Sequence, residues 1–465
     1  MSARRPQLIL LASLSIVAAG LGLYAYFGVM KTEERETQRK ERAEKIFASS
    51  PPGARGPDGG APADPVFTSI EIKAKDDTTA LEKKEKGWRI TAPVSSPADS
   101  YVVDQVLGQL RSGKLQATVE ENPTDADLLK YGLKEPKFSV TAFAYAPDAR
   151  KITLHGGIEN PFDGSVYVQR EGDKAVYVVD GSVRFALEKS TFDLRDKDVL
   201  AVDEPKLQRV DVKTRAQAYS LERNSDKTWR LVAPRALPAD TSAVNSMLSG
   251  LRGAKALAFL PYSERERARL GLDAPSVDAT FVQADGGKIR IRLVAASADG
   301  GGKAYALRED GSQSVLAEIP PSPIADLSKN PLDLRDRSVL IFKQDQVAKI
   351  VFSPGGSAKE IAVEKIVPDG GDSEEWVVVT PEKGPAKRWK ISSLLYKLAS
   401  LKAASVVADA PVDFSKYGIS GSSRGVGLFD ATGKELARLE IGKDVKDKPG
   451  AVYLRGSRNQ VLQMD

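Results

Sequence analysis

Apolar residues recur at helical spacing in three separate places along the chain. Counting from Asp99, Asp240 and Lys387, the fourth, seventh, eighth and eleventh residues are apolar in every case. The twelve residues are Val103, Val106, Leu107, Leu110, Val244, Met247, Leu248, Leu251, Ile391, Leu394, Leu395 and Leu398. This spacing predicts three amphipathic helices, each packing one face on a sheet. Asp99 and Asp240 stand where an N-cap belongs, whereas Lys387 predicts a weaker or shifted start for the third helix.

Short runs of alternating apolar and polar residues surround each predicted helix and indicate half-buried strands. Around the first helix they lie at 67–72, 88–90, 138–143, 151–154 and 166–168. The corresponding runs lie at 210–212, 229–231, 277–282, 288–293 and 304–306 around the second helix, and at 350–352, 376–378, 426–429, 435–441 and 452–454 around the third. Short turns between so many strands favour antiparallel pairing. We therefore predict an α+β fold in which each unit is a mostly antiparallel sheet with one main amphipathic helix.

The same signals occur in the same order three times, so the chain contains three tandem repeats. A tryptophan precedes a proline by five residues at Trp88, Trp229 and Trp376, and a glycine follows each tryptophan after 42 to 44 residues. The glycines stand in the triplets Tyr131-Gly132-Leu133, Leu270-Gly271-Leu272 and Tyr417-Gly418-Ile419. Each copy is longer than a solenoid repeat and large enough to be a small domain. The predicted repeats are residues 66–205, 206–345 and 346–465, of which the last is shortened.

An uncharged apolar stretch precedes the repeats. It runs from Leu8 to Met30 behind a short tail at 1–7. At 1.5 Å per residue a helix of this length extends about 34 Å, enough to cross a bilayer core of roughly 30 Å. A cleaved signal peptide is the alternative, with a passable small-residue site at 17–19, but the apolar run continues past that site. We therefore expect a single transmembrane helix that makes the membrane a partner of this protein.

The segment at 31–65, between the predicted anchor and the first repeat, has two parts. Residues 31–45 are highly charged, with glutamate–lysine pairs at a favourable spacing, and predict a solvated helix that continues the anchor. Residues 49–65 contain five prolines and four glycines, and predict a flexible linker that holds the repeats away from the bilayer.

Positive charges flank the predicted anchor on both sides, so they leave its orientation open. The short tail contains Arg4 and Arg5, whereas six Lys/Arg lie between 31 and 45, and that larger count favours a cytoplasmic stalk. A short tail followed by a long C-terminal part is the usual plan of a signal anchor. We therefore expect a single-pass protein of the inner (cytoplasmic) membrane with its repeats in the periplasm.

Composition excludes several kinds of chemistry. The 465 residues include no cysteine and one histidine, His155, which excludes thiolate metal sites, cysteine nucleophiles and multi-histidine metal sites. The net charge is +5, but residues 1–47 hold eight Lys/Arg against five Glu. The repeats therefore carry no basic stripe, and nucleic acid is a poor candidate partner. We expect no enzyme activity, no cofactor and no metal, and we assign no catalytic residue.

Two stretches match catalytic motifs only in part. Gly108 to Lys114 has the spacing of a phosphate-binding loop, but Leu115 replaces the hydroxyl that binds Mg²⁺, and the stretch ends a helix. Gly421 to Gly425 resembles a nucleophile elbow around Ser423, but no histidine follows it in the chain. We interpret the first as a helix C-terminus with its turn and the second as a Gly/Ser loop.

Three further features are better explained by structure than by chemistry. His155 follows a short strand and precedes two glycines, so we interpret it as a surface or turn residue. The tetrad Asp-Leu-Arg-Asp recurs at 193–196 and 333–336. Its carboxylates could act as acid and base or bind a cation, but a leucine anchor and an arginine–carboxylate pair would lock each repeat to the next. The repeated tryptophans are expected in the core.

Together these signals resemble the family called domain of unknown function 4340. The resemblance covers about residues 66–465. Its most specific pieces are Trp88 to Pro93, Ala98-Asp99, Tyr131-Gly132-Leu133 and Asp193 to Asp196, with their partners in the second repeat. The third repeat departs from the pattern at Lys387 and lacks the tetrad. The resemblance implies a bacterial, membrane-anchored envelope protein, often associated with an ABC-type export or gliding-type auxiliary system, and implies no catalytic residues.

We therefore expect a non-enzymatic envelope scaffold that binds another envelope protein, as an accessory of an ABC-type transport or gliding-type system. The alternative is a ligand- or glycan-binding protein that uses clefts between repeats, which predicts an exposed tryptophan or tyrosine at a junction. A carboxylate-based hydrolase would need two acidic residues that converge in a pocket, and the sequence supplies no such pair.

Overall fold

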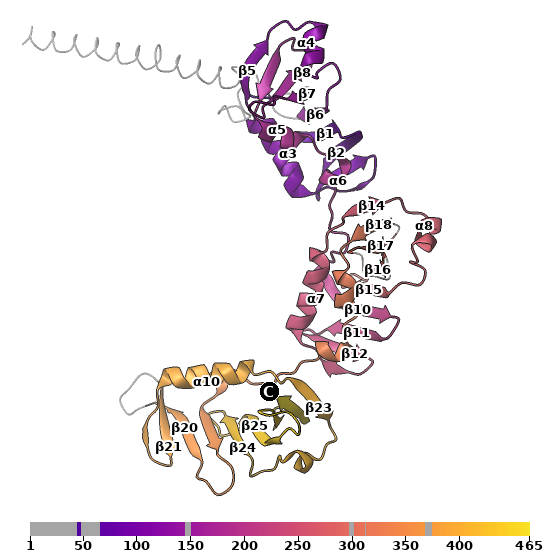
Figure 1. The fold of residues 1–465 in the computed structure, drawn as a ribbon. Helices are drawn as coiled ribbons and strands as arrows, with labels where there is room; N and C mark the ends of the chain where they lie inside the picture. The colour runs from indigo at the N-terminus through magenta and orange to yellow at the C-terminus, as the bar shows by residue number, and fades with distance from the viewer. Residues whose placement is uncertain (1–43, 48–65, 145–149, 297–301, 312, 368–373) are drawn as a thin grey trace, which may run out of the picture.

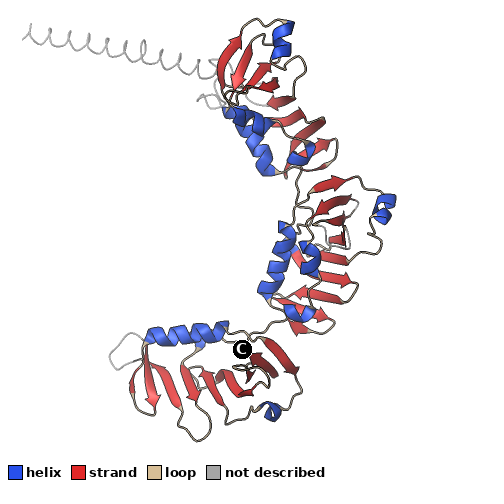
Figure 2. Ribbon diagram, viewed as in Figure 1, coloured by secondary structure: helices blue, strands red, loops and turns tan. Residues whose placement is uncertain are grey.

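Three β-rich units follow one another along the chain and form an open arc (Figure 1). The computed structural model describes residues 44–47, 66–144, 150–296, 302–311, 313–367 and 374–465. Each unit contains one nine-stranded sheet and one long helix. The long helices, α3 (Ser100–Ser112), α7 (Thr241–Gly253) and α10 (Arg388–Ser400), lie on the concave side of the arc (Figure 2). The predicted tandem repeats are confirmed, and the fold is richer in sheet than the sequence indicated.

The strands have the same spatial order in all three sheets. The first sheet runs β4-β3-β2-β1-β6-β7-β8-β9-β5, and the other two repeat this order strand for strand. Every strand pair among the described residues is antiparallel, as predicted. In each unit the strand that follows the long helix, β5, β14 or β23, crosses to the far edge and pairs with the last strand. The three units are therefore copies of one topology.

The bounds of the strands show how closely the copies correspond. The first sheet contains β1 (Phe67–Ala74), β2 (Asp77–Lys84), β3 (Gly87–Ala92), β4 (Ser96–Pro97), β5 (Leu115–Glu120), β6 (Phe138–Ala144), β7 (Arg150–Glu159), β8 (Val166–Arg170) and β9 (Val176–Val179). The second contains β10 (Leu207–Thr214), β11 (Ala218–Arg223), β12 (Trp229–Ala233), β13 (Leu237–Pro238), β14 (Ala258–Leu260), β15 (Val277–Gln283), β16 (Lys288–Ala295), β17 (Ala304–Asp310) and β18 (Gln313–Ile319). The third contains β19 (Lys349–Ser353), β20 (Ile361–Ile366), β21 (Glu375–Thr380), β22 (Gly384–Pro385), β23 (Ser405–Asp409), β24 (Arg424–Phe429), β25 (Glu435–Asp444), β26 (Val452–Arg455) and β27 (Gln460–Met464).

The long helices begin where the sequence predicts. The Asp99 carboxylate accepts hydrogen bonds from the backbone N–H groups of the first turn of α3, and Asp240 does the same for α7. Lys387 precedes α10 directly but makes no such bond, so the third helix starts without a side-chain cap, and its start is not shifted. All twelve predicted apolar positions face a core, and only Leu394 among them is half-buried.

The repeated tryptophans lie in the cores of their units, as predicted. Trp88, Trp229 and Trp376 are at most 9% exposed, and the proline that follows each of them is preceded by a cis peptide bond. The Trp229 indole N–H also donates to the Asn245 side-chain oxygen of α7 at 3.3 Å. The fourth tryptophan, Trp389, is 67% exposed on α10 and belongs to no core.

The glycine triplets end short helices and dock them on the sheet. The helices α4 (Asp125–Lys130), α8 (Glu264–Arg269) and η5 (Phe414–Tyr417) are each followed within two residues by the triplet glycine. Gly132, Gly271 and Gly418 have φ angles of 69°, 75° and 70°, a left-handed conformation that favours glycine. In the first and third units the triplet tyrosine packs on the tyrosine of β8 or β26, with ring centroids 4.6 and 5.0 Å apart.

Residues 44–47 change the interpretation of the stalk. Ile46 and Phe47 are almost fully buried in the first core, and the Ile46 N–H donates to the Gly113 carbonyl at 2.8 Å. Lys45 forms a β-bridge with Lys114, so the solvated helix predicted to extend to residue 45 is wrong at its end. The Phe47 ring lies 4.9 Å from that of Phe67. Residues on both sides of segment 48–65 therefore pack in the first unit.

The predicted transmembrane helix, Leu8 to Met30, lies outside the described residues. So do residues 31–43 of the stalk and the proline-rich part at 49–65. In the part of the chain that the structure describes, no helix combines the length and apolar character needed to span a membrane.

We predict that Phe47→Ala destabilises the first unit by about 3 kcal/mol, because a buried aromatic ring and its contact with Phe67 are lost. Chemical unfolding of the full-length chain, followed by fluorescence of Trp88 with the other tryptophans replaced by phenylalanine, measures the change. Phe162→Ala is the matched control, because Phe162 is 95% exposed. Equal stability of the two variants would show that residues 44–47 do not belong to the first core.

Candidate functional site

The Asp-Leu-Arg-Asp tetrads connect the end of one unit to the start of its own long helix. The tetrad leucines, in α6 (Thr191–Leu194) and η3 (Pro331–Leu334), are buried. The Asp99 N–H donates to the Leu194 carbonyl at 2.8 Å, and the Asp240 N–H donates to the Leu334 carbonyl at 2.7 Å. These bonds occupy the N-cap backbone, so each tetrad is fixed to the N-terminal end of α3 or α7. The chain then enters the next unit.

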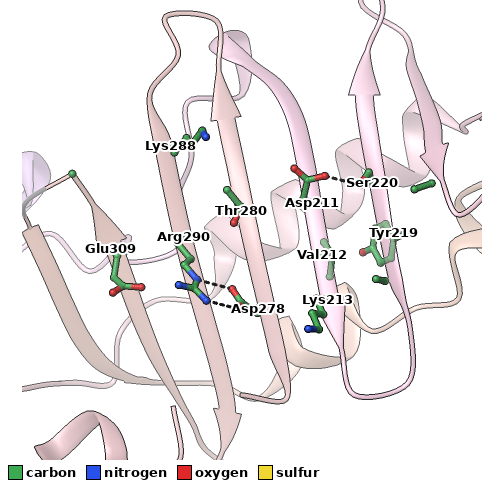
Figure 3. A pocket seen from close by; sticks show the side chains of 13 residues that line it. Asp211, Val212, Lys213, Tyr219, Ser220, Asp278, Thr280, Lys288, Arg290 and Glu309 are labelled. Carbon is green, nitrogen blue, oxygen red and sulfur yellow. Dashed lines mark hydrogen bonds and ion pairs between the residues drawn. The ribbon is translucent and has the colours of Figure 1, made fainter. Parts of the chain in front are cut away.

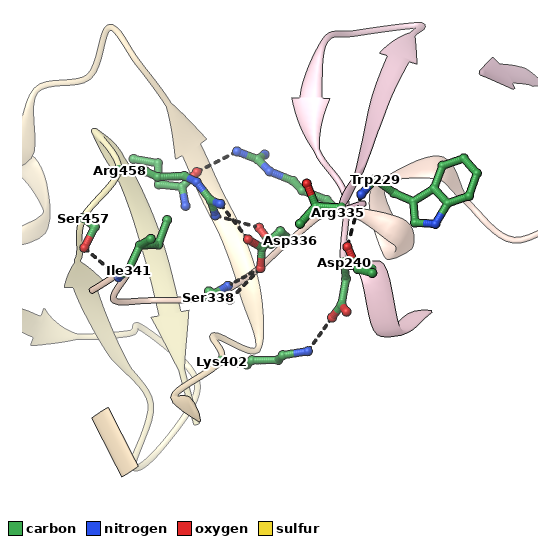
Figure 4. Close-up of polar contacts among 12 residues, drawn as sticks. Trp229, Asp240, Arg335, Asp336, Ser338, Ile341, Lys402, Ser457 and Arg458 are labelled. Carbon is green, nitrogen blue, oxygen red and sulfur yellow. Dashed lines mark hydrogen bonds and ion pairs between the residues drawn. The ribbon is translucent and has the colours of Figure 1, made fainter. Parts of the chain in front are cut away.

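At the second junction the tetrad makes ionic contacts with the third unit (Figure 4). Arg335, which is almost fully buried, donates to the Asp409 carboxylate and, at 2.7 Å, to the Gln460 side-chain oxygen. Asp336 accepts from Arg458 at 2.6 Å, and the Lys402 ammonium lies 2.5 Å from an oxygen of Asp240. The predicted leucine anchor and arginine–carboxylate lock are confirmed here.

Two carboxylates of this junction, Asp409 and Asp336, are held in their ionised form. Hydrogen bonds and charge from Arg335, helped by Arg235, hold the pKa of the Asp409 carboxyl below its usual value. Burial acts to raise the pKa of the Asp336 carboxyl, but hydrogen bonds from Ser338 and Arg458 outweigh it and leave that pKa lowered. Both carboxylates serve the junction and are not available as acids near neutral pH.

The first junction uses different contacts on the same backbone plan. The Arg195 guanidinium lies over the Phe259 ring, 3.5 Å from its centroid, and no described carboxylate lies within ion-pair distance of it. The linking residues Val199, Leu200 and Val202 are part of the second core. The expected arginine–carboxylate lock is therefore wrong for the first tetrad, because aromatic and apolar packing takes its place.

Three hollows among the described residues could receive a ligand. The largest, about 800 Å³, is a shallow depression on the open face of the second sheet (Figure 3). Acidic and basic residues line it in equal number. Arg290 pairs with Asp278 at 2.6 Å, and Asp211 pairs with Arg209 at 2.8 Å. A second hollow of about 530 Å³ lies beside Trp229, and a third of about 330 Å³ lies between the first and second units. Only the third lies at a junction.

The motif-like stretches have the structural roles that the sequence favours, with one correction. Gly108 to Lys114 covers the end of α3 and the turn after it, and the Ser423 hydroxyl donates to the Gly418 carbonyl within a turn. His155 lies inside β7, opposite Ser139, and is partly buried. The expectation that it ends a strand is wrong, because Gly156 and Gly157 continue the strand where a Cβ would strike Phe138 or the Tyr131 carbonyl.

Acidic residues do not gather into a metal site in the ranges that the structure describes. The two tetrads lie at different junctions. Within them, Asp193 pairs with Lys75 and Asp336 pairs with Arg458, and the pKa values of both carboxyls are lowered, so neither is suited to act as an acid near neutral pH.

The outer face of α10 is a feature that sequence reasoning missed. Trp389 and Tyr396, seven residues apart on the helix, are each 67% exposed. Between Lys383 and Lys402 the chain has six Lys/Arg and no Asp or Glu. The signal was present in the sequence, because neither aromatic residue belongs to the apolar stripe.

Comparison with known protein families matches three stretches of the chain, 88–228, 229–367 and 376–465, to a family described as domain of unknown function (DUF4340). Together these stretches cover most of the chain. The chain belongs to the DUF4340 family. Each DUF4340 match begins at a repeat tryptophan, in β3, β12 or β21, and the first two matches end inside the following sheet. A search of curated proteins found no match.

We predict that Asp409→Ala weakens the attachment of the third DUF4340 unit to the second by about 3 kcal/mol, because Arg335 stays buried without its anion. The chain has no cysteine, so Ser225→Cys and Ser422→Cys allow spin labels on the two units, and the distribution of distances between them should broaden. Asp345→Ala is the control, since Asp345 is exposed. A broadening no larger than that of the control would contradict the predicted role.

Acid should loosen the same junction. Because the pKa values of Asp409 and Asp336 are lower in the folded protein, their contribution is complete above the unfolded pKa of about 4 and is lost as pH falls through the folded values. The same spin-label pair should report a narrow distribution at pH 7 that widens below about pH 4. A distribution unchanged down to pH 2, with circular dichroism also unchanged, would exclude these carboxylates as the lock.

Proposed function

We propose that this protein is a non-enzymatic, membrane-anchored scaffold of the bacterial cell envelope, with its repeats in the periplasm. It binds another envelope protein and serves as an accessory of an ABC-type transport or gliding-type system. The observation that carries the proposal is the exposed aromatic and basic face of α10, on a chain of units held in fixed order by their junctions.

The face of α10 has the composition of a binding surface. Trp, Tyr and Arg are the residues that contribute most often to protein–protein binding energy. Trp389 has the ammonium of Lys390 5.6 Å from its ring centroid, and no described carboxylate pairs with Lys387, Arg388, Lys390 or Lys397. A large exposed indole beside unpaired cations favours a partner that covers both.

The other two long helices provide an internal comparison. Trp389 is the second residue after the N-cap position, where α3 has Tyr101 and α7 has Ser242. Tyr396 corresponds to Gly108 in α3 and to Ser249 in α7. Because the buried faces of the three helices are alike, the difference on the outer face of α10 is not needed for packing and supports a role in binding.

The charge of the α10 face specifies the kind of partner. Five cations without a carboxylate among them, from Lys383 to Lys397, attract an acidic surface and repel a basic one. We therefore propose an envelope protein with an acidic patch as the occupant. All three long helices lie on the concave side of the arc (Figure 2), which supports a partner seated inside it.

A second candidate function is binding of a small ligand or glycan in a cleft between repeats. The hollow of about 330 Å³ at the first junction favours it. Tyr101, 73% exposed in the first turn of α3 close to that junction, is the kind of residue that this alternative predicts.

We predict that Trp389→Ser combined with Tyr396→Ser reduces partner capture at least tenfold in full-length protein expressed in native membranes. A photo-crosslinking residue placed at Ser393, between the two aromatic residues, identifies the partner, and binding of the purified pair is then measured at low and high salt. Tyr101→Ser is the matched control, since it removes an equally exposed ring from α3.

Three outcomes of this experiment count against the proposal. The double variant could crosslink and bind as well as the wild type. Binding of the purified pair could be insensitive to salt, which excludes the basic face. The repeats could bind anionic phosphatidylglycerol vesicles through Trp389 and Tyr396 with no protein crosslinked, which would make the membrane surface the occupant.

A further inference from the structure

The two tetrad arginines have the same backbone setting but different surroundings. Arg195 forms a β-bridge with Ala98, and Arg335 forms the corresponding bridge with Ala239. Arg335 receives the Asp409 carboxylate and the Gln460 amide oxygen from the next unit. Arg195 receives the ring of Phe259 on one face and no described hydrogen-bond acceptor for its N–H groups. The first junction therefore provides no described protein acceptor for its partly buried guanidinium, whereas the second junction provides a carboxylate and an amide oxygen.

The strand register explains why one of the two acceptors, the amide of Gln460, has no counterpart at the first junction. Tyr305 pairs with Glu318 in the second sheet, as Tyr453 pairs with Gln463 in the third. Counting back three residues from each partner places Val315 at the position of Gln460. Val315 has no acceptor, so the site that the amide oxygen fills at the second junction is apolar at the first.

The unfilled space is the hollow of about 330 Å³ between the first and second units. The residues that line it and bear on its chemistry are Ser96, Arg195, Phe259, Arg308, Asp310 and Val315. The Ser96 side chain is 5% exposed, and its hydroxyl oxygen has no hydrogen-bond partner. A buried hydroxyl without a partner is costly, and this one lies in the same hollow as the arginine. The volume is at the lower end of the range for small-molecule pockets.

Two of the three carboxylates that line the hollow already form ion pairs. Asp198 pairs with Lys255, and Asp310 lies 3.0 Å from Arg308, which also donates to the Val199 and Ala201 carbonyls. Asp196 is exposed to solvent. Burial lowers the pKa of the Arg195 guanidinium, and no neighbouring carboxylate opposes that effect. Arg195 is therefore the cation of this hollow that lacks an anionic partner among the described residues.

We propose that this hollow binds a small carboxylate-bearing molecule. Its carboxylate accepts hydrogen bonds from the Arg195 guanidinium and the Ser96 hydroxyl, and so takes the place that Asp409 takes at the second junction. A planar guanidinium matches a carboxylate with two parallel bonds. Phe259 and Val315 cover the apolar part of the ligand. This inference rests on the second candidate function and does not depend on the α10 face.

Chemical modification of Arg195 tests the proposal on the full-length protein in detergent. Phenylglyoxal labels exposed arginines, and peptide mass spectrometry gives the rate for each site. Glutamate and acetate at 10 mM should slow labelling of Arg195 at least threefold relative to chloride of equal ionic strength. The rates at Arg111, which is exposed, and at Arg335, which already holds a carboxylate, should not change.

Two variants make the result specific. Ser96→Ala should fold normally, because the lost hydroxyl has no partner, and should reduce the protection by glutamate. Val315→Glu supplies a carboxylate from within the chain, so Arg195 should label slowly without any ligand and should no longer respond to glutamate.

Equal slowing by chloride and by the carboxylates would overturn the proposal. Stronger protection by inorganic phosphate than by glutamate would overturn the choice of carboxylate. Neither result would alter partner capture by α10, so the two proposals fail separately.

Discussion

The arc depends on one backbone contact, made once at each junction between units. The N-cap residue of a long helix donates its N–H to the carbonyl of the tetrad leucine, as Asp99 does to Leu194 and Asp240 to Leu334. A buried leucine side chain holds the donor and acceptor in place. Because the chain leaves each unit from this point, the start of one helix determines where the next unit begins. Two similar connections in series produce an arc with its three long helices on one side.

Side chains give each junction a separate character on this common backbone. At the second junction, Arg335 and Asp336 meet the charged partners Asp409 and Arg458, and the interface is closed by ionic contacts. At the first junction, Phe259 covers one face of Arg195 and a hollow remains. The long helices likewise share one feature and differ in another. The inner faces of α3, α7 and α10 are nearly interchangeable, whereas the outer face of α10 alone presents a tryptophan and a tyrosine together.

Most of the fold could be predicted because its signals are local. The apolar stripe that begins at Val103 recurs in all three helices, and an N-cap aspartate or its absence at Lys387 is visible in the sequence. In each unit four of the nine strands were missed, namely those equivalent to β2, β4, β5 and β9 of the first sheet. β2 is one example, since its residues Asp77–Lys84 are mostly polar and it is held by neighbours on both sides. The burial of Ile46 and Phe47 was also missed. These two apolar residues directly follow a highly charged stretch, and they pack on parts of the first unit that are distant in the sequence.

The candidate sites were predictable only in part, because only some of their features arise from local signals in the sequence. Sequence by itself determined the number of units, the recurrence of the same signals in each unit, the burial of Trp88 and its counterparts, and the use of the tetrads as connectors. Each of these follows from periodicity or from a residue's own conformational preference. Only the tertiary structure decided that Arg335 forms an ion pair with Asp409, whereas Arg195 packs on the ring of Phe259. These partners lie more than 60 residues away along the chain, and only the packing of one unit against the next brings them together.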